Sequence, residues 1–209
     1  MYQKKKEVNY QMVTVLECET IGGAWQRAFD LIMQNGKSIR DDNEELIELL
    51  HLFLIINSPE KELLVKQRHN ESMKKWMREN FTQIIRVPEL NNSWSYGWRL
   101  FNFQGKNQID WIIKKLKKKP ESKSATISML QRAGEESYIP CVSLLDFKIR
   151  NNQLWLTVTC RSLDFGQKAI YNMTNLARLS EKVANKLGIS QYRLFMHINS
   201  AHIYRKDLK

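Results

Sequence analysis

Two apolar, β-prone runs separated by a short polar turn constrain the fold of this chain more than any other feature. The runs cover residues 142–149 and 153–160, and Arg150-Asn151-Asn152 lies between them. A turn this short joins antiparallel neighbours, so the sequence predicts a β-hairpin. The hairpin brings the residue before its first strand to the same end as the residue after its second strand. We therefore expect Cys141 to lie near Arg161.

Strand and helix patterns alternate along the rest of the chain, which predicts an α/β fold in a single domain, residues 1–209. Further strands are expected over 7–18, 125–130 and 195–198. Helices are expected over 21–35, 60–80, 108–117 and 170–187, with a loop over 88–95. Residues 43–54 have helical spacing, but their apolar end at 52–56 is equally compatible with a buried strand.

Composition points to a soluble globular protein, with 43% hydrophobic and 26% charged residues. No apolar run approaches the roughly 20 residues of a membrane span, and no apolar segment of a signal peptide follows the basic N-terminus. Three cysteines without metal-binding spacing predict free thiols in a reducing compartment, so we expect a cytoplasmic protein without a metal site.

A net charge of +11 favours anionic partners, whether nucleotide, polyglutamate or nucleic acid. Part of this charge lies in the lysine-rich run 114–119. An exposed helix end with lysines near its C-terminal dipole explains that run more simply than a dedicated nucleic-acid surface. Nucleic-acid binding therefore stays open, but no motif indicates it.

Cys141 is the candidate nucleophile of the chain. Most free cysteines are inert core residues, but this one follows Pro140 at the start of a predicted strand, where a side chain can be directed into a cleft. A nucleophilic cysteine needs positive charge to stabilise its thiolate, and Arg161 is the nearest predicted source. Taken alone, Arg161 is more simply interpreted as a surface residue.

Polar residues that follow the hairpin suit the parts of a nucleotide. The Arg161 guanidinium presents a bidentate fork to phosphate, and the Ser162 hydroxyl adds a donor. The Asn172 amide has both a donor and an acceptor, so it can pair with a uracil edge, although a residue near a helix N-terminus has a structural explanation too. His202 and Tyr204 share one face of a predicted strand end, where they can hold a sugar hydroxyl.

The combined pattern resembles the thymidylate synthases and the related pyrimidine-nucleotide hydroxymethylases. The resemblance rests on Pro140-Cys141, Arg161-Ser162-x-Asp164, Asn172 and His202-x-Tyr204. Further landmarks are Glu48, Tyr96-Gly97, Arg99, Gln108 and Pro120-x-Ser122. The sequence of residues 200–204 and the compact N-terminal region are most similar to the short archaeal-type branch of the family.

This resemblance implies a mixed β-sheet flanked by helices, with two such sheets packed back to back in a homodimer. It implies that Cys141 attacks carbon 6 of a uracil ring and that methylene-tetrahydrofolate, or a modified reduced folate, supplies one carbon to carbon 5. Glu48 would organise water and proton transfers, Asp164 would position base and cofactor, and Tyr96 would be a further catalytic residue. The implied substrate-binding residues are Arg161, Ser162, Asn172, His202, Tyr204 and Lys123.

The chain departs from the family pattern at several positions. Lys123-Ser124 stands where a pair of arginines usually reaches across the dimer to phosphate, and Val142 replaces a frequent histidine. Cys160 precedes Arg161, where glutamine or an aromatic residue is common. The sequence stops at Lys209, where many members continue to a tail that closes over folate. We expect these differences to affect phosphate affinity and hydride transfer more than nucleotide recognition.

Three functions remain open at this point. The first is methylation of dUMP to dTMP. The second is a uridylate or cytidylate hydroxymethylase, in which water adds in place of a hydride. The third is a catalytically weakened homologue that binds nucleotide or nucleic acid.

Overall fold

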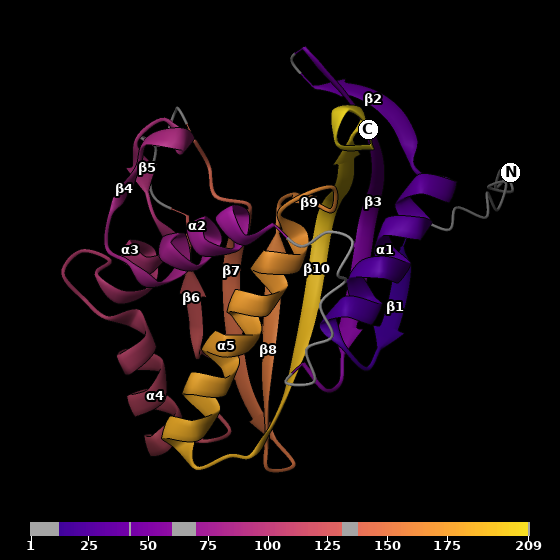
Figure 1. Cartoon of the computed structure of the whole chain (residues 1–209). Coiled ribbons are helices and arrows are strands. Elements are labelled where there is room, and N and C mark those ends of the chain that lie inside the picture. The colour runs from indigo at the N-terminus through magenta and orange to yellow at the C-terminus, as the bar shows by residue number, and fades with distance from the viewer. Residues whose placement is uncertain (1–12, 42, 60–69, 131–137, 209) are drawn as a thin grey trace, which may run out of the picture.

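The computed structural model describes residues 13–41, 43–59, 70–130 and 138–208. Its centre is an eight-stranded mixed sheet in the order β1-β3-β10-β8-β7-β6, with β2 paired to β3 and β9 paired to β10 (Figure 1). The strands are β1 Thr14–Cys18, β2 Lys37–Asp41, β3 Glu44–Ile56, β6 Thr126–Ser128, β7 Val142–Arg150, β8 Gln153–Cys160, β9 Leu163–Asp164 and β10 Gln191–Tyr204. A separate two-stranded ribbon consists of β4 Arg86–Val87 and β5 Ser93–Trp94.

In the described part of the chain, five α-helices accompany the sheet. They are α1 Ile21–Asn35, α2 Glu71–Thr82, α3 Tyr96–Phe101, α4 Gln108–Lys118 and α5 Ala169–Leu187. Short 3-10 helices follow at Pro88–Leu90 and Arg205–Leu208. The ends of the α-helices are encoded locally, since Thr20 accepts a hydrogen bond from Gly23 N and Gly188 leaves α5 in the left-handed region at φ 73°. None of the described helices is long and apolar enough to cross a membrane.

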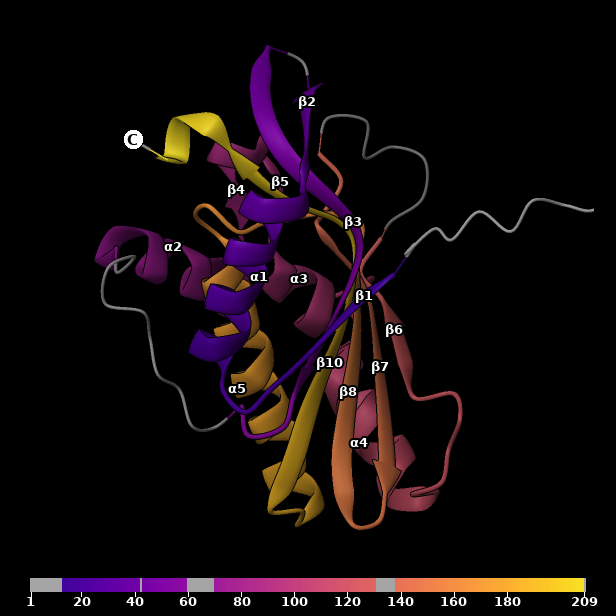
Figure 2. The ribbon, with the colours of Figure 1, turned by 90° about the vertical axis from the view of Figure 1, so that its right-hand side faces the viewer.

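The helices lie on one face of the sheet and form the core with it (Figure 2). Side chains alternate along β10, so Leu194, Met196 and Ile198 are buried on the helix side. Helix α5 connects β9 to β10, and β10 runs parallel to β8, which requires such a crossover. Within the described residues no helix covers the opposite face, where Phe53 stacks on His197 and Trp155 stacks on Phe195.

The hairpin prediction is confirmed, as β7 and β8 pair antiparallel from Val142↔Cys160 to Arg150↔Gln153. The α/β class and the helices expected at 21–35, 108–117 and 170–187 are also confirmed, within one residue at each end. Of the strand expected at 7–18, residues 14–18 form β1, and 7–12 lie outside the described residues. Of the helix expected at 60–80, residues 71–80 are helical, and 60–69 lie outside the described part.

Three other expectations need correction. Of the two alternatives for this segment the helix over 43–54 is wrong, because 44–56 is one continuous strand. It pairs with β10 over 46–56, with β2 over 44–48 and with β1 over 52–56. Pairing with these distant strands overrides a local pattern that suited either structure. The loop expected at 88–95 contains β5, which pairs with β4. The last strand extends far beyond 195–198, because β10 pairs with β3, β8 and β9 in turn.

Candidate active site

A pocket of about 200 Å³ lies where β7, β8, β9 and β10 meet the N-terminal part of α5. Helix α2 and the start of α3 form its other wall. The lining residues are Asp41, Trp76, Met77, Asn80, Tyr96, Tyr138, Cys141, Arg161, Ser162, Leu163, Asp164, Lys168, Asn172, His202 and Tyr204. Eight of the ten residues singled out from the sequence therefore lie together, although they come from four separate parts of the chain.

The hairpin brings Cys141 and Arg161 together as expected. The Arg161 backbone N–H donates to the Cys141 carbonyl over 2.9 Å, and a register shift between Val142 and Leu144 marks the start of β7. The Ser162 hydroxyl donates to the Cys141 Sγ over 3.6 Å, and the Arg161 Nη1 donates to the Ser162 Oγ over 3.0 Å. Two further bonds, from Nε and Nη2 to the Ile139 carbonyl, fix the guanidinium. The arrangement thus couples a positive charge to the thiol through one hydroxyl.

Two buried phenols flank the same thiol. The Tyr96 hydroxyl accepts a hydrogen bond from the Val142 N–H over 3.2 Å, and Tyr138 hydrogen-bonds to Cys141. Burial raises the pKa of both phenols, so both keep their protons at neutral pH. Sequence reasoning missed Tyr138, and the available signal was its place three residues before Cys141 in Tyr-Ile-Pro-Cys.

The other thiol near this end of the hairpin is unsuited to nucleophilic chemistry. Cys160 is fully buried, and burial followed by the charge of Cys141 raises the pKa of its thiol. A thiol that stays protonated in an apolar environment is a poor nucleophile. Cys141 is half-buried and lines the pocket, whereas Cys160 does not, so Cys141 is the thiol of this pair that a ligand in the pocket can reach.

Asp164 and His202 form one polar wall of the pocket. They are direct partners in the β9–β10 ladder, and His202 packs edge-on against Tyr204 with ring centroids 5.1 Å apart. The Asp164 Oδ1 accepts from the backbone N–H groups of Gly166 and Gln167 over 2.9 and 3.2 Å. Burial raises the pKa of this carboxyl, while His202 opposes that shift. The register of two short strand segments therefore places this acid next to the histidine.

Asn172 lines the pocket and has an unused acceptor. Its Nδ2 donates to the Lys168 carbonyl one turn earlier in α5 over 3.1 Å. Its Oδ1 is buried and has no hydrogen-bond partner in the described residues. A buried carbonyl oxygen of this kind costs free energy unless a donor pairs with it. The pocket is therefore prepared for a ligand that brings an N–H or O–H group to this atom.

Lys168 and Trp76 connect this pocket to a second one, of about 420 Å³. The Lys168 Nζ lies 5.9 Å from the centre of the Trp76 ring. Sequence reasoning assigned a role to neither Trp76 nor Lys168. The second pocket is lined by Asn70, Ser72, Met73, Trp76, Glu89, Leu90, Gln167 and Lys168.

Comparisons with known proteins agree with this geometry. The family model described as thymidylate synthase matches residues 44–209. The chain belongs to the thymidylate synthase family. Provisionally named thymidylate synthases of Methanosarcina barkeri and Methanothermobacter thermautotrophicus are 31% and 28% identical, over 96% and 95% of this chain and 94% and 96% of theirs. The solved thermostable thymidylate synthase A of Bacillus subtilis has the same fold, with a TM-score of 0.71 at 14% identity over 90% of this chain and 81% of that chain.

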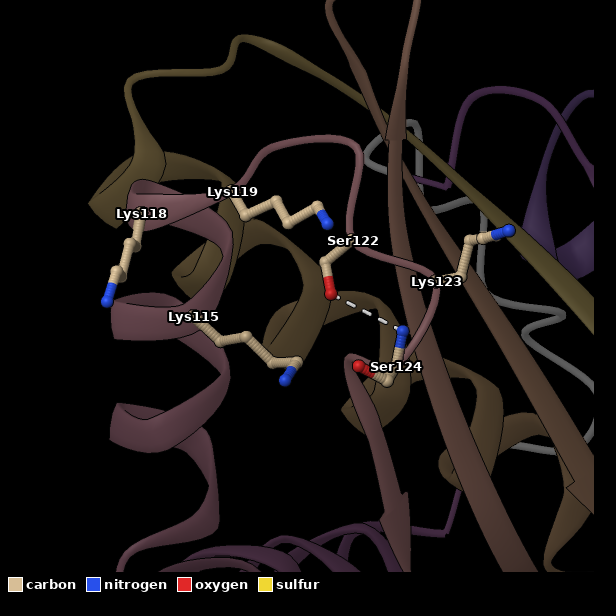
Figure 3. Close-up of a pocket in the computed structure, with 6 residues that line it drawn as sticks. All are labelled: Lys115, Lys118, Lys119, Ser122, Lys123 and Ser124. Carbon is tan, nitrogen blue, oxygen red and sulfur yellow. Dashed lines mark hydrogen bonds between the residues drawn. The ribbon is translucent and has the colours of Figure 1, made fainter.

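Two of the residues taken from the family resemblance do not line this pocket. Glu48 lies on β3, where its carboxylate accepts a hydrogen bond from the Ser200 hydroxyl over 2.5 Å. This bond holds the side chain against β10, and Glu48 is not among the residues that line the pocket. Lys123 lies in the α4–β6 loop and lines a different pocket (Figure 3). Within this thymidylate synthase fold, the carboxylates that do line the pocket are Asp41 and Asp164.

Proposed function

We propose that this protein methylates dUMP to dTMP with methylene-tetrahydrofolate, through a covalent bond between Cys141 and carbon 6 of the uracil ring. The observation that carries the proposal is the unpaired Asn172 Oδ1, which is buried in the same pocket as the Cys141 thiol. Uracil presents an N–H at ring position 3, which is the donor that this oxygen lacks. A nucleophile and a residue that can recognise the pyrimidine edge thus line one cavity.

The thiol is activated by its neighbours. Ser162 donates to the sulfur and itself accepts from the Arg161 guanidinium, so negative charge on the sulfur is stabilised through this chain of donors. When the Cys141 sulfur bonds to carbon 6, the ring π-electrons move to carbon 5 and carbonyl oxygen 4, and carbon 5 becomes nucleophilic. Tyr96 and Tyr138 remain protonated near the sulfur, and Tyr138 hydrogen-bonds to Cys141.

The remaining pocket residues suit the other parts of a nucleotide. Arg161 lies at the exposed mouth, where its guanidinium offers N–H donors to a 5′-phosphate next to Ser162. His202 and Tyr204 lie on the β10 wall, where their polar atoms can hold the sugar. Asp164 is fixed by two backbone N–H groups, so its second oxygen is available to position base or co-substrate.

The adjoining 420 Å³ pocket fits a reduced folate. It shares Trp76 and Lys168 with the nucleotide pocket, and Met73 and Leu90 add apolar surface. Trp76 would stack on the pterin ring, and the Lys168 ammonium would meet a ring carbonyl or a carboxylate. When bound, the folate supplies the one-carbon unit and, for methylation, the hydride. Trp76 and Lys168, which both pockets share, would orient it beside the nucleotide.

We also propose that the protein is a homodimer formed through the uncovered sheet face. That face carries the Phe53–His197 and Trp155–Phe195 stacks, and Val15 beside them is 58% exposed. Sheet faces with this much apolar and aromatic surface are normally covered. In such a dimer Lys123 would offer its charge to the partner's nucleotide. Sedimentation equilibrium tests this, because a monomer at micromolar concentration refutes it.

The central experiment is incubation of the purified protein with dUMP and methylene-tetrahydrofolate, followed by mass spectrometry of nucleotide and folate. We expect dTMP and dihydrofolate; a hydroxymethylated nucleotide with tetrahydrofolate would assign the hydroxymethylase activity instead. Cys141→Ser should lower turnover by a factor of about 100 or more while dUMP still binds, because a covalent nucleophile is lost. Cys18→Ser is the matched control and should retain activity, since Cys18 lies outside the pocket lining.

A further inference from the structure

A second cationic cavity lies away from the proposed nucleotide pocket. It has a volume of about 520 Å³ and is formed by the end of α4 and the loop that leads into β6. The lining residues are Lys115, Lys118, Lys119, Ser122, Lys123 and Ser124 (Figure 3). Where the loop enters β6, the Phe147 N–H donates to the Ala125 carbonyl. The loop therefore lies beside the part of β7 that is nearer to the hairpin turn. Cys141 is at the other end of β7, so within one protomer the two sites are separate.

The charge at this cavity is largely uncompensated. Residues 108–124 contain six lysines but only two acidic residues, Asp110 and Glu121. Among the ion pairs of the described residues, none involves the four lysines of the cavity. Clustered cations in a concave surface raise the local positive potential and concentrate anions. An anion bound among these lysines would reduce their mutual repulsion.

Hydroxyl groups complete the cavity. Ser122 is buried, with 3% exposure, and its Oγ accepts the Ser124 N–H over 3.3 Å. Figure 3 shows the Lys115 and Lys119 side chains extending toward these two serines, while Lys118 and Lys123 extend away from them. Lysine ammonium and serine hydroxyl groups are the donors that phosphate oxygens accept from. The helix dipole accounts for Lys115 and Lys118 in the last turn of α4, but not for Lys119, Lys123 and the serines beyond the helix.

We propose that this cavity binds an oligophosphate, meaning an anion with two or more linked phosphate groups. Several separate lysines around one hollow suit a chain of phosphates better than a single phosphate, since each ammonium is a point charge without the fork geometry of arginine. The source is either a free oligophosphate or the phosphate chain of a nucleotide. Trp111 lies one helical turn from Lys115, whose Nζ is 5.0 Å from the Trp111 ring centre, so its fluorescence can report occupancy.

The test is titration of the full-length protein with sodium tripolyphosphate, followed by calorimetry and by tryptophan fluorescence, at low and at physiological salt. The variant Lys115→Gln/Lys118→Gln/Lys119→Gln should bind at least tenfold more weakly than wild type. The matched control, Lys37→Gln/Lys75→Gln/Lys106→Gln, removes the same charge from exposed sites elsewhere and should bind like wild type. Thermal denaturation of each variant verifies that it is folded.

Additional measurements distinguish a free oligophosphate from a nucleotide, and this cavity from the nucleotide pocket. Arg161→Gln should keep the affinity for tripolyphosphate, because that arginine belongs to the nucleotide pocket. Equal affinity for tripolyphosphate and ATP assigns free oligophosphate chemistry, whereas at least tenfold tighter ATP binding assigns a nucleotide. The proposal is overturned if wild type does not bind, if the control variant loses as much affinity as the test variant, or if only Arg161→Gln loses it. Binding of a single-stranded oligonucleotide that tripolyphosphate cannot displace also overturns it.

Discussion

Replacing Asn172 by aspartate tests directly whether this residue distinguishes uracil from cytosine. In the structure the Asn172 side chain is 3% exposed, its Nδ2 is used by the Lys168 carbonyl, and its Oδ1 is left as an acceptor. Uracil brings an N–H to this oxygen, whereas cytosine brings a ring nitrogen acceptor. Two buried acceptors that face each other without a hydrogen between them weaken binding by about 1–3 kcal/mol. Wild type should therefore prefer dUMP over dCMP by about 5- to 150-fold from this contact alone.

The aspartate variant should move this preference toward cytosine. Burial favours the protonated carboxyl, which can donate to the cytosine ring nitrogen while its other oxygen accepts from the exocyclic amine. The variant also loses the hydrogen bond to Lys168, which should lower the free energy of unfolding by about 0.5–1.5 kcal/mol. The decisive quantity is the ratio of kcat/KM for dUMP to that for dCMP, in which effects on stability cancel.

Asn175→Asp is the matched control for this experiment. Asn175 is also buried on α5, and its Nδ2 donates to the Tyr171 carbonyl over 2.8 Å, the same bond that Asn172 makes one turn earlier. It does not line the pocket, so its variant should lose stability without a change in the specificity ratio. The reasoning fails if the Asn172 variant keeps the wild-type ratio, or if the Asn175 variant shifts it equally.

Three further predictions concern the thiol, the buried acid and the basic loop. Tyr138→Phe should slow alkylation of Cys141 by iodoacetamide about three- to tenfold, because a donor to the thiolate is lost; an unchanged rate, measured by mass spectrometry, would contradict the contact. The pKa of Asp164 is higher in the folded protein than in the unfolded chain, so protonation of this carboxyl stabilises the fold at low pH. That stabilisation is lost as the pH rises from about 4 through the folded-state pKa. The free energy of unfolding of wild type, relative to that of Asp164→Asn, should therefore fall between about pH 4 and 7. Parallel stability curves would refute this. Lys123→Arg with Ser124→Arg should tighten dUMP binding about tenfold in the dimer, with most of the gain lost at high salt, as calorimetry at two ionic strengths will show; no gain would mean that the loop does not face phosphate.

The sequence by itself determined the local structure and much of the site. The short turn after residue 149 was enough to predict the hairpin, and therefore the proximity of Cys141 and Arg161. Caps such as Thr20 and Gly188 encode helix ends within a few residues of sequence. The ordered set of polar residues, with its spacing along the chain, carried the family resemblance.

Only the tertiary structure decided the state of 44–56 and the membership of the pocket. Whether this segment is helix or strand depends on backbone partners about 150 residues away on β10, which no local pattern contains. The same pairing holds Glu48 against Ser200 and outside the pocket lining. Conversely, Tyr138 and Lys168 enter the pocket because the β7, β9 and α5 segments converge there. Side-chain type and spacing determine what a residue can do, whereas strand register and helix packing determine which residues meet, and those depend on contacts distributed over the whole chain.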